Sequence, residues 1–185
     1  MKRLVIFLMV VISSLALGAE VAGVEVSETV KVGEKNLILN GAGVRKKAFL
    51  SLYVGSLYTQ EVTKDPVEVM NGDEEMSVRL DIVSKMISND AMREAVENGF
   101  EASTGKEELT VLKSKIEGFV EVFSEEITVG DQFVFDYLPG IGVKTYKNGK
   151  LLTTVEGVDF KRALYGIWLG DKPADKNLKK GMLNR

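Results

Sequence analysis

Residues 40–59 read NGAGVRKKAFLSLYVGSLYT, and this stretch contains the longest uncharged segment of the chain after residue 19 that is typical of a strand. Its second part, residues 49–59, is rich in aromatic and aliphatic side chains and carries no charge, which is typical of a central strand in a sheet. Its first part places Gly41 and Gly43 just before a basic triplet that begins at Arg45. We therefore expect one strand to end near the glycines, a turn to follow, and a long buried strand to come next.

Apolar or alternating segments bounded by turn residues predict further strands on both sides of this stretch. They cover residues 24–32, 37–39, 76–83, 132–138, 143–146 and 151–155. The last two flank Asn148 and Gly149, a dipeptide that favours a type I′ hairpin turn. Connections this short join antiparallel neighbours, so we expect an antiparallel sheet of about six strands.

Helical signals lie between and after these strands. Asp65 followed by Pro66 predicts a helix start, because aspartate is a good N-cap and proline fits the first helical turn. Apolar residues at helical spacing predict two helices in the middle of the chain, the first capped by Ser88 or Asn89 and the second beginning near Lys106. The last two helices are expected over residues 159–169 and between Pro173 and Leu183. Since no repeat or linker interrupts the series, we predict one α+β domain with helices packed on one side of the sheet.

The first nineteen residues, MKRLVIFLMVVISSLALGA, have the pattern of a secretory signal peptide. Lys2 and Arg3 precede an apolar run, and small residues follow it. A membrane anchor is the alternative, but it needs about 20 apolar residues, and this run is interrupted at Ser13. Cleavage is expected after Gly18 or Ala19. Cleavage after Ala19 leaves residues 20–185 as a single exported domain without a stable membrane span.

The composition excludes several classes of chemistry. The chain has no Cys and no His, so it has no disulfide, no Cys/His zinc site and no imidazole base. The acidic run that starts at Asp73 lacks the spacing of a calcium loop, and we expect no metal and no cofactor. Removing Lys2 and Arg3 from the net charge of −3 leaves −5, which argues against a nucleic-acid partner.

Two features of residues 40–59 have alternative interpretations. Gly41 and Gly43 invite a dinucleotide-loop assignment, but Lys46 stands where the third glycine would be, and no helix is expected there. Arg45 follows the glycines and precedes the apolar strand. Its guanidinium can either reach into a cleft and grip a carboxylate bidentately or lie in solvent at the strand end. Tyr53 is most simply explained as a core residue with its hydroxyl at the sheet margin.

Three segments together resemble the chalcone isomerase superfamily, and above all its exported bacterial branch. They are residues 40–59, AVENGF at 95–100 and FKRALYGIWLGDKP at 160–173. The resemblance covers nearly all of residues 20–185. It implies an open-faced β-sandwich in which a large antiparallel sheet is backed by helices, with a ligand cleft between the sheet and the helices.

The resemblance also implies roles for single residues. The enzymes of the superfamily use an arginine after the glycine-rich segment to hold a phenolate, and Arg45 matches it. Asn98 matches an asparagine on the following helix. Glu94 stands in place of a lysine there, which reverses a charge beside the expected phenolate and opposes that chemistry. Ala91 replaces a tyrosine, and Ile167 falls where a hydroxylated residue is expected. The catalytic set is therefore only partly present.

The fatty-acid-binding relatives pair the same arginine with a tyrosine around a carboxylate, and Arg45 with Tyr53 matches that arrangement. The leading hypothesis is thus an exported, periplasmic, non-catalytic protein that binds a small amphipathic acid such as a fatty acid. Its ligand-binding residues would be Arg45, Tyr53, Asn98 and Glu94. An isomerase or intramolecular lyase, with Tyr53 or Glu94 moving a proton, is one alternative. A structural or partner-binding envelope protein is the other, and the sequence indicates no particular oligomeric state.

Overall fold

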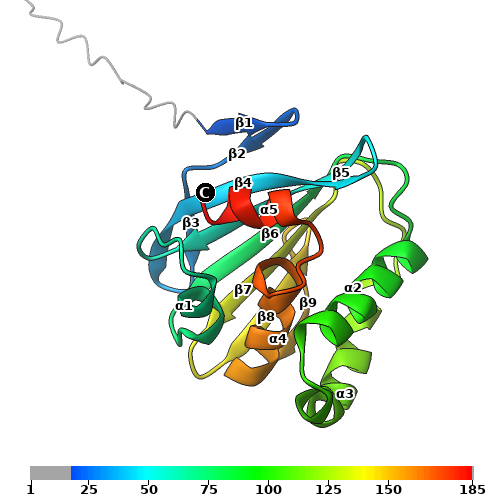
Figure 1. The fold of residues 1–185 in the computed structure, drawn as a ribbon. Helices are drawn as coiled ribbons and strands as arrows, with labels where there is room; N and C mark the ends of the chain where they lie inside the picture. Colours follow the sequence, from blue (N-terminus) through cyan, green and yellow to red (C-terminus); the bar gives the residue numbers. More distant parts are fainter. Residues whose placement is uncertain (1–17, 185) are drawn as a thin grey trace, which may run out of the picture.

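The computed structural model describes residues 18–184, and its centre is a curled antiparallel sheet (Figure 1). Within the described residues this sheet has seven strands, and their order in space is their order in the chain. They are β3 (Thr29–Val32), β4 (Lys35–Lys47), β5 (Leu50–Thr59), β6 (Met76–Ile82), β7 (Gln132–Leu138), β8 (Gly142–Lys147) and β9 (Lys150–Val155). The predicted α+β class and large antiparallel sheet are confirmed.

The helices pack against one face of this sheet. They are α1 (Pro66–Asn71), α2 (Asn89–Ser103), α3 (Lys106–Val120) with the 3₁₀ turn η1 (Glu121–Phe123), α4 (Val158–Leu169) and α5 (Lys176–Met182). The main hydrophobic core lies between them and the sheet, and it joins the α2 stripe of Met92, Val96 and Phe100 to the inward side chains of β5 to β8. α2 and α4 contact each other and lie in front of the sheet, so together they form a wall that faces it (Figure 1).

Local signals place several of these elements as expected. The Asp65 carboxylate accepts the Val67 N–H at 2.8 Å and caps α1, and Ser88 caps α2 through the Ala91 N–H at 3.2 Å. The turn between β8 and β9 contains Asn148 with φ of 50° and Gly149 with φ of 79°. Both angles are positive, as a type I′ turn requires, so the predicted hairpin is confirmed.

The opposite face of the sheet carries a second, smaller hydrophobic core. It contains Val26, Val30, Val32, Leu37, Val54 and Tyr58. The single strand expected over residues 24–32 was wrong, because two strands with different partners share this segment. β2 (Val24–Val26) forms a separate two-stranded sheet with β1 (Ala19–Val21), and β3 joins the main sheet beside β4.

The expected turn at Gly41 and Gly43 was also wrong, because both glycines lie inside the continuous strand β4. A Cβ atom on Gly41 would come within 2.2 Å of the Gly181 carbonyl oxygen, and one on Gly43 within 3.1 Å of the Leu178 backbone. Both contacts are with α5 or its end. The glycines therefore allow the C-terminal helix to lie directly on the backbone of β4, and they do not reverse the chain.

The predicted signal peptide covers residues 1–19, of which only Gly18 and Ala19 belong to the described residues. Ala19 is the first residue of β1. No helix within residues 18–184 has the length and apolar character needed to cross a membrane.

Candidate functional site

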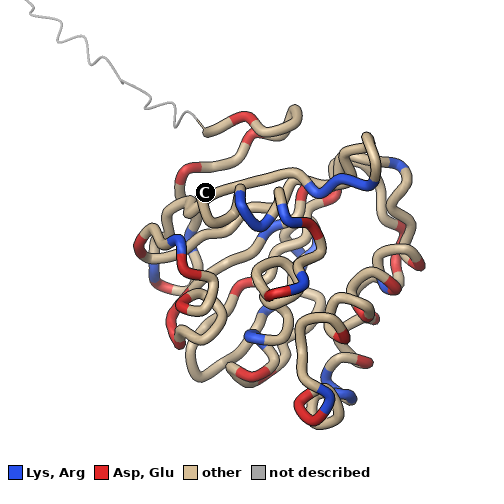
Figure 2. Tube along the Cα trace, in the orientation of Figure 1, with Lys and Arg blue, Asp and Glu red and all other residues tan. Residues whose placement is uncertain are grey.

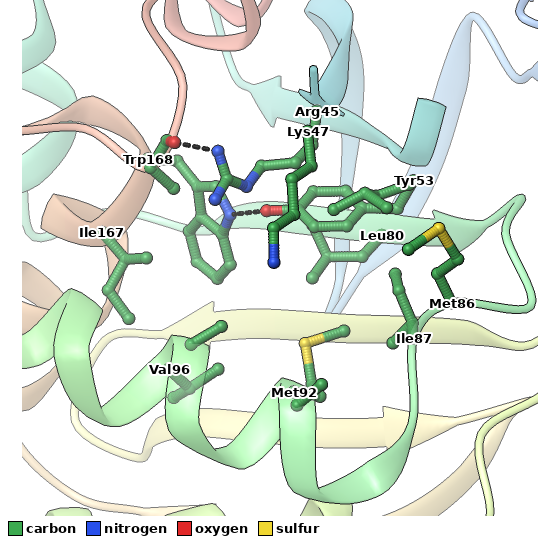
Figure 3. Close-up of a pocket in the computed structure, with 14 residues that line it drawn as sticks. Arg45, Lys47, Tyr53, Leu80, Met86, Ile87, Met92, Val96, Ile167 and Trp168 are labelled. Atoms are coloured by element: carbon green, nitrogen blue, oxygen red, sulfur yellow. Dashed lines mark hydrogen bonds between the residues drawn. The ribbon is translucent and has the colours of Figure 1, made fainter. Parts of the chain in front are cut away.

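A cavity of about 260 Å³ lies between the sheet and helices α2 and α4 (Figure 3). Its walls come from β4, β5 and β6 on one side, from the two helices on the other, and from the loop before α2. Most of the lining is apolar, including Leu52, Leu80, Ile87, Met92, Val96 and Ile167. Four polar side chains also reach it, namely Arg45, Lys47, Tyr53 and Trp168.

Arg45 lies opposite Tyr53 in the register of β4 and β5, so the two side chains are neighbours on the same face of the sheet. The Arg45 guanidinium donates one hydrogen bond, from Nη1 to the carbonyl oxygen of Ala174. That carbonyl belongs to the segment between α4 and α5, which also closes this end of the cavity. The other N–H groups of the guanidinium make no hydrogen bond with any described residue, so they are available to a ligand.

Tyr53 provides a second donor. Its ring is 7% exposed, and its hydroxyl oxygen accepts a hydrogen bond from Trp168 Nε1 at 3.0 Å (Figure 3). The hydroxyl proton itself has no acceptor among the residues that the structure describes. Burial raises the pKa of Tyr53, although the Trp168 hydrogen bond and the charge of Arg45 act in the opposite direction. Because the pKa is raised, the hydroxyl stays protonated at neutral pH and can donate its hydrogen.

Lys47 adds a second positive charge, and its side chain is directed into the cavity (Figure 3). An acidic group, Asp175, lies at this end of β4, where its carboxylate accepts the Lys46 backbone N–H at 3.2 Å and caps α5. Burial acts to raise the pKa of Asp175, but three backbone N–H groups and the Arg45 charge outweigh it and lower the pKa. The Asp175 carboxylate is thus already satisfied by the backbone and by α5, and it does not neutralise Lys47.

Taken together, these groups define a cavity that offers hydrogen-bond donors and positive charge at one end and apolar walls elsewhere. Guanidinium and hydroxyl donors are the groups that bind a carboxylate or a similar anion most strongly. An apolar chain attached to that anion would contact the walls made by α2 and α4. The geometry therefore suits an amphipathic anion.

The structure brings two of the four predicted site residues together. Arg45 and Tyr53 line the cavity, whereas Glu94 and Asn98 are exposed on α2 and do not line it. The reason is helical geometry, because Ala91 and Ala95 occupy the positions of α2 that face the cavity. Together with Met92 and Val96 they form the arc of α2 that faces the cavity, and at about 100° per residue Glu94 and Asn98 fall outside this arc, on the side away from Met92 and Val96. The role predicted for Glu94 and Asn98 thus has no support from their positions.

Sequence reasoning missed Lys47 and Trp168. The alternation of a strand places residues i and i+2 on one face, so Arg45 on the cavity side predicts Lys47 beside it. A tryptophan in a strongly apolar helix needs a partner for its indole N–H, and a tyrosine on the facing strand is a natural acceptor. Trp168 is 2% exposed and finds that partner in Tyr53.

The sequence profile of the chalcone isomerase-like family matches residues 18–184. A search of curated protein sequences finds no match. Among solved structures, the chain is similar to the crystal structure of a fatty-acid binding protein from Arabidopsis thaliana, with a TM-score of 0.63 and 20% sequence identity. The alignment covers 80% of this chain and 87% of that one, and at this identity it shows a shared fold. Since the family profile spans almost the whole chain, this protein belongs to the chalcone isomerase-like family.

Proposed function

We propose that this protein binds a small amphipathic acid, such as a fatty acid, without transforming it. The observation that carries the proposal is the pair of unused donors in the cavity, on the Arg45 guanidinium and the Tyr53 hydroxyl. They lie on facing positions of neighbouring strands and border an otherwise apolar space. The fatty-acid binding protein with a similar fold supports the same ligand class.

In the bound state the carboxylate would accept hydrogen bonds from Arg45 and Tyr53, and Lys47 would add electrostatic attraction. The alkyl chain would lie against Leu80, Val96 and Ile167. Each methylene group that leaves water contributes about 0.8 kcal/mol, so affinity should rise with chain length until the cavity is filled. With about 260 Å³ available, the cavity is small for a ligand site, which favours short and medium chains over long ones.

The cavity lining contains few side chains that could transfer a proton in an isomerase or lyase reaction. Ala91 and Ile167 occupy two positions where the superfamily enzymes carry functional groups, and both line the cavity without a titratable atom. Glu94, the acidic candidate for proton transfer, lies outside it. Tyr53 is the remaining candidate, and its raised pKa keeps it a hydrogen-bond donor and makes it a poor general base. A structural envelope protein would be expected to have an occluded cleft, whereas this protein holds a cavity of about 260 Å³.

We also propose that residues 1–19 direct the chain to the bacterial periplasm and are removed. The basic start, the short apolar run and the small residues before Glu20 support this. Intact mass measurement of protein recovered from the periplasm of an expressing cell tests it. A mass that begins at Ala19 or Glu20 is expected, and retention of the full chain in the cytoplasm would contradict it.

Native mass spectrometry tests the ligand proposal. Protein purified without detergent is mixed with saturated fatty acids from octanoate to palmitate, and the adducts of wild type, Arg45→Ala and Lys46→Ala are compared. Lys46 is the matched control, because it neighbours Arg45 on β4, has an exposed side chain and does not line the cavity. We expect adducts on wild type and Lys46→Ala and their loss from Arg45→Ala. Equal adducts on all three proteins would refute the proposed head-group site.

A further inference from the structure

The most exposed aromatic side chain among the described residues lies two residues after Lys47, which lines the cavity. Phe49 is 88% exposed at the tip of the hairpin that joins β4 to β5. Leu50 beside it is 37% exposed. The preceding residue, Ala48, has a φ of 53°, a conformation that alanine adopts only at a cost. The hairpin thus holds a large apolar side chain in water and keeps it away from both hydrophobic cores.

A second apolar side chain faces water on the neighbouring loop. Met86, in the loop before α2, is 57% exposed and lines the cavity together with Lys47. The backbone hydrogen bond from Val83 N to Leu52 O, at 3.0 Å, holds this loop against β5. Lys47 beside the hairpin tip and Met86 on the loop both line the cavity, so the two segments border the same end of it. We refer to Phe49, Leu50 and Met86 with the flanking Lys46 and Lys85 as the tip surface.

The charge around these apolar side chains is positive, although the chain as a whole is acidic. Figure 2 shows basic residues along the end of β4 and on the loop before α2. Lys46, Lys47 and Lys85 form no ion pair with any residue in the described part of the chain. Lys46 and Lys85 are exposed. Their charges are thus free to act on a partner outside the molecule.

We infer that the tip surface docks on an anionic lipid bilayer. Exposed Phe, Leu and Met side chains enter the boundary between head groups and acyl chains, and lysines beside them attract anionic head groups. The apolar side chains sit on two narrow tips and form no continuous face of the size that a stable protein partner buries. This combination of protruding apolar tips and unpaired lysines fits a membrane surface better than a protein.

The position of the tip surface beside the cavity relates docking to the route by which a ligand would enter. With Phe49 in the bilayer, the end of the cavity lined by Lys47 and Met86 would face the lipid. An amphipathic acid would then pass from the bilayer to Arg45 without crossing open water. This consequence rests on the proposed function, whereas docking itself does not require any ligand in the cavity.

Co-flotation with vesicles tests docking. The probe is the chain from residue 20 onward, mixed with vesicles of phosphatidylcholine alone or of phosphatidylcholine and phosphatidylglycerol in equal parts, without free fatty acid. The variant Phe49→Ser with Lys46→Glu removes one apolar anchor and reverses one charge. The matched control is Val111→Ser with Lys106→Glu on α3, because Val111 is 75% exposed, Lys106 is exposed and forms no ion pair among the described residues, and neither residue lines the cavity.

We expect wild type and the α3 control to bind the anionic vesicles, to bind neutral vesicles weakly, and to be released by salt. In the tip variant, loss of the Phe49 anchor should weaken binding to anionic vesicles by about tenfold or more. The charge reversal at Lys46 should weaken it by a further factor of about five or more. Equal vesicle binding by the tip variant and the control would overturn the inference. Absence of binding to anionic vesicles, or concentration-dependent self-association that only the tip variant loses, would overturn it as well.

Native mass spectrometry with octanoate or dodecanoate in solution separates this inference from the proposed function. Neither Phe49 nor Lys46 lines the cavity, so the tip variant should keep the adduct seen on wild type. A tip variant that keeps the adduct but floats poorly supports docking. Adducts missing from every protein, with flotation intact in wild type, would refute the ligand proposal and leave docking standing.

Discussion

Replacing Tyr53 with phenylalanine removes one oxygen atom and separates the stabilising role of this residue from its role in binding. The hydroxyl is the hydrogen-bond partner of Trp168 Nε1, at 3.0 Å, and both side chains are buried. Without it, the indole N–H loses its acceptor inside the protein. Leaving one buried donor unsatisfied costs about 1–3 kcal/mol, so the free energy of unfolding should fall by that amount.

Urea denaturation of wild type, Tyr53→Phe and Tyr146→Phe measures this effect. Tyr146 is the matched control, since the same atom is deleted from a half-buried tyrosine whose hydroxyl bonds to no described residue. We expect the control to lie within about 0.5 kcal/mol of wild type. If Tyr53→Phe is no less stable than Tyr146→Phe, water in the cavity replaces the hydroxyl, and the reasoning about the buried pair is refuted.

The same variant has a second expected effect. A hydrogen bond from the hydroxyl to a carboxylate is worth about 1.5–3 kcal/mol, so dodecanoate should bind about tenfold to a hundredfold more weakly to Tyr53→Phe. Titration calorimetry with dodecanoate measures this below the unfolding temperature of each variant. Unchanged affinity in a folded Tyr53→Phe protein would place the head group elsewhere.

Two further substitutions test the fold. Gly41→Ala should destabilise the protein by about 1–3 kcal/mol, because its Cβ would strike the backbone of α5. Gly118→Ala on α3, where no atom lies within 4 Å of the added Cβ, should stabilise it by about 0.5–1 kcal/mol. Thermal unfolding of both variants measures these effects, and a neutral Gly41→Ala would show that α5 does not pack on β4. Lys161 is fully buried, and burial lowers its pKa to about 8, although Asp73 and Glu74 oppose the shift. Between pH about 8 and about 10 the unfolded chain holds the proton that the folded chain has lost, so the unfolding free energy of wild type should rise with pH relative to Lys161→Met. Parallel pH profiles for the two proteins would contradict the buried assignment.

The parts of the fold that depend on neighbouring residues could be predicted from the sequence. Asp65 and Pro66 start a helix, and Asn148 and Gly149 turn a hairpin, through contacts within a few residues. The glycines of β4 could not be assigned this way. A glycine in a turn and a glycine beneath a packed helix look the same in sequence, and the helix that decides the matter begins at Lys176.

The same difference between local signals and contacts of distant segments applies to the candidate site. Arg45 and Tyr53 were predicted from the resemblance to relatives, and cross-strand register then brings them together. Glu94 and Asn98 were predicted from the same alignment, but on a helix a change of one residue turns the side chain by about 100°. The alignment therefore places both residues on α2, where their side chains are exposed and outside the cavity lining, and their role in binding stays a prediction. Lys47 follows from Arg45 by the alternation of the strand, whereas the contact between Trp168 and Tyr53 depends on how α4 packs against the sheet.

If the cavity recognises an anionic head through the donors of Arg45 and Tyr53, it distinguishes dodecanoate from dodecanol, which share a chain and differ in the head group. Calorimetry on wild type and Arg45→Ala measures this difference. We expect wild type to bind dodecanoate at least about tenfold more tightly than dodecanol and Arg45→Ala to lose this preference. Equal affinities of wild type for the two ligands would contradict it.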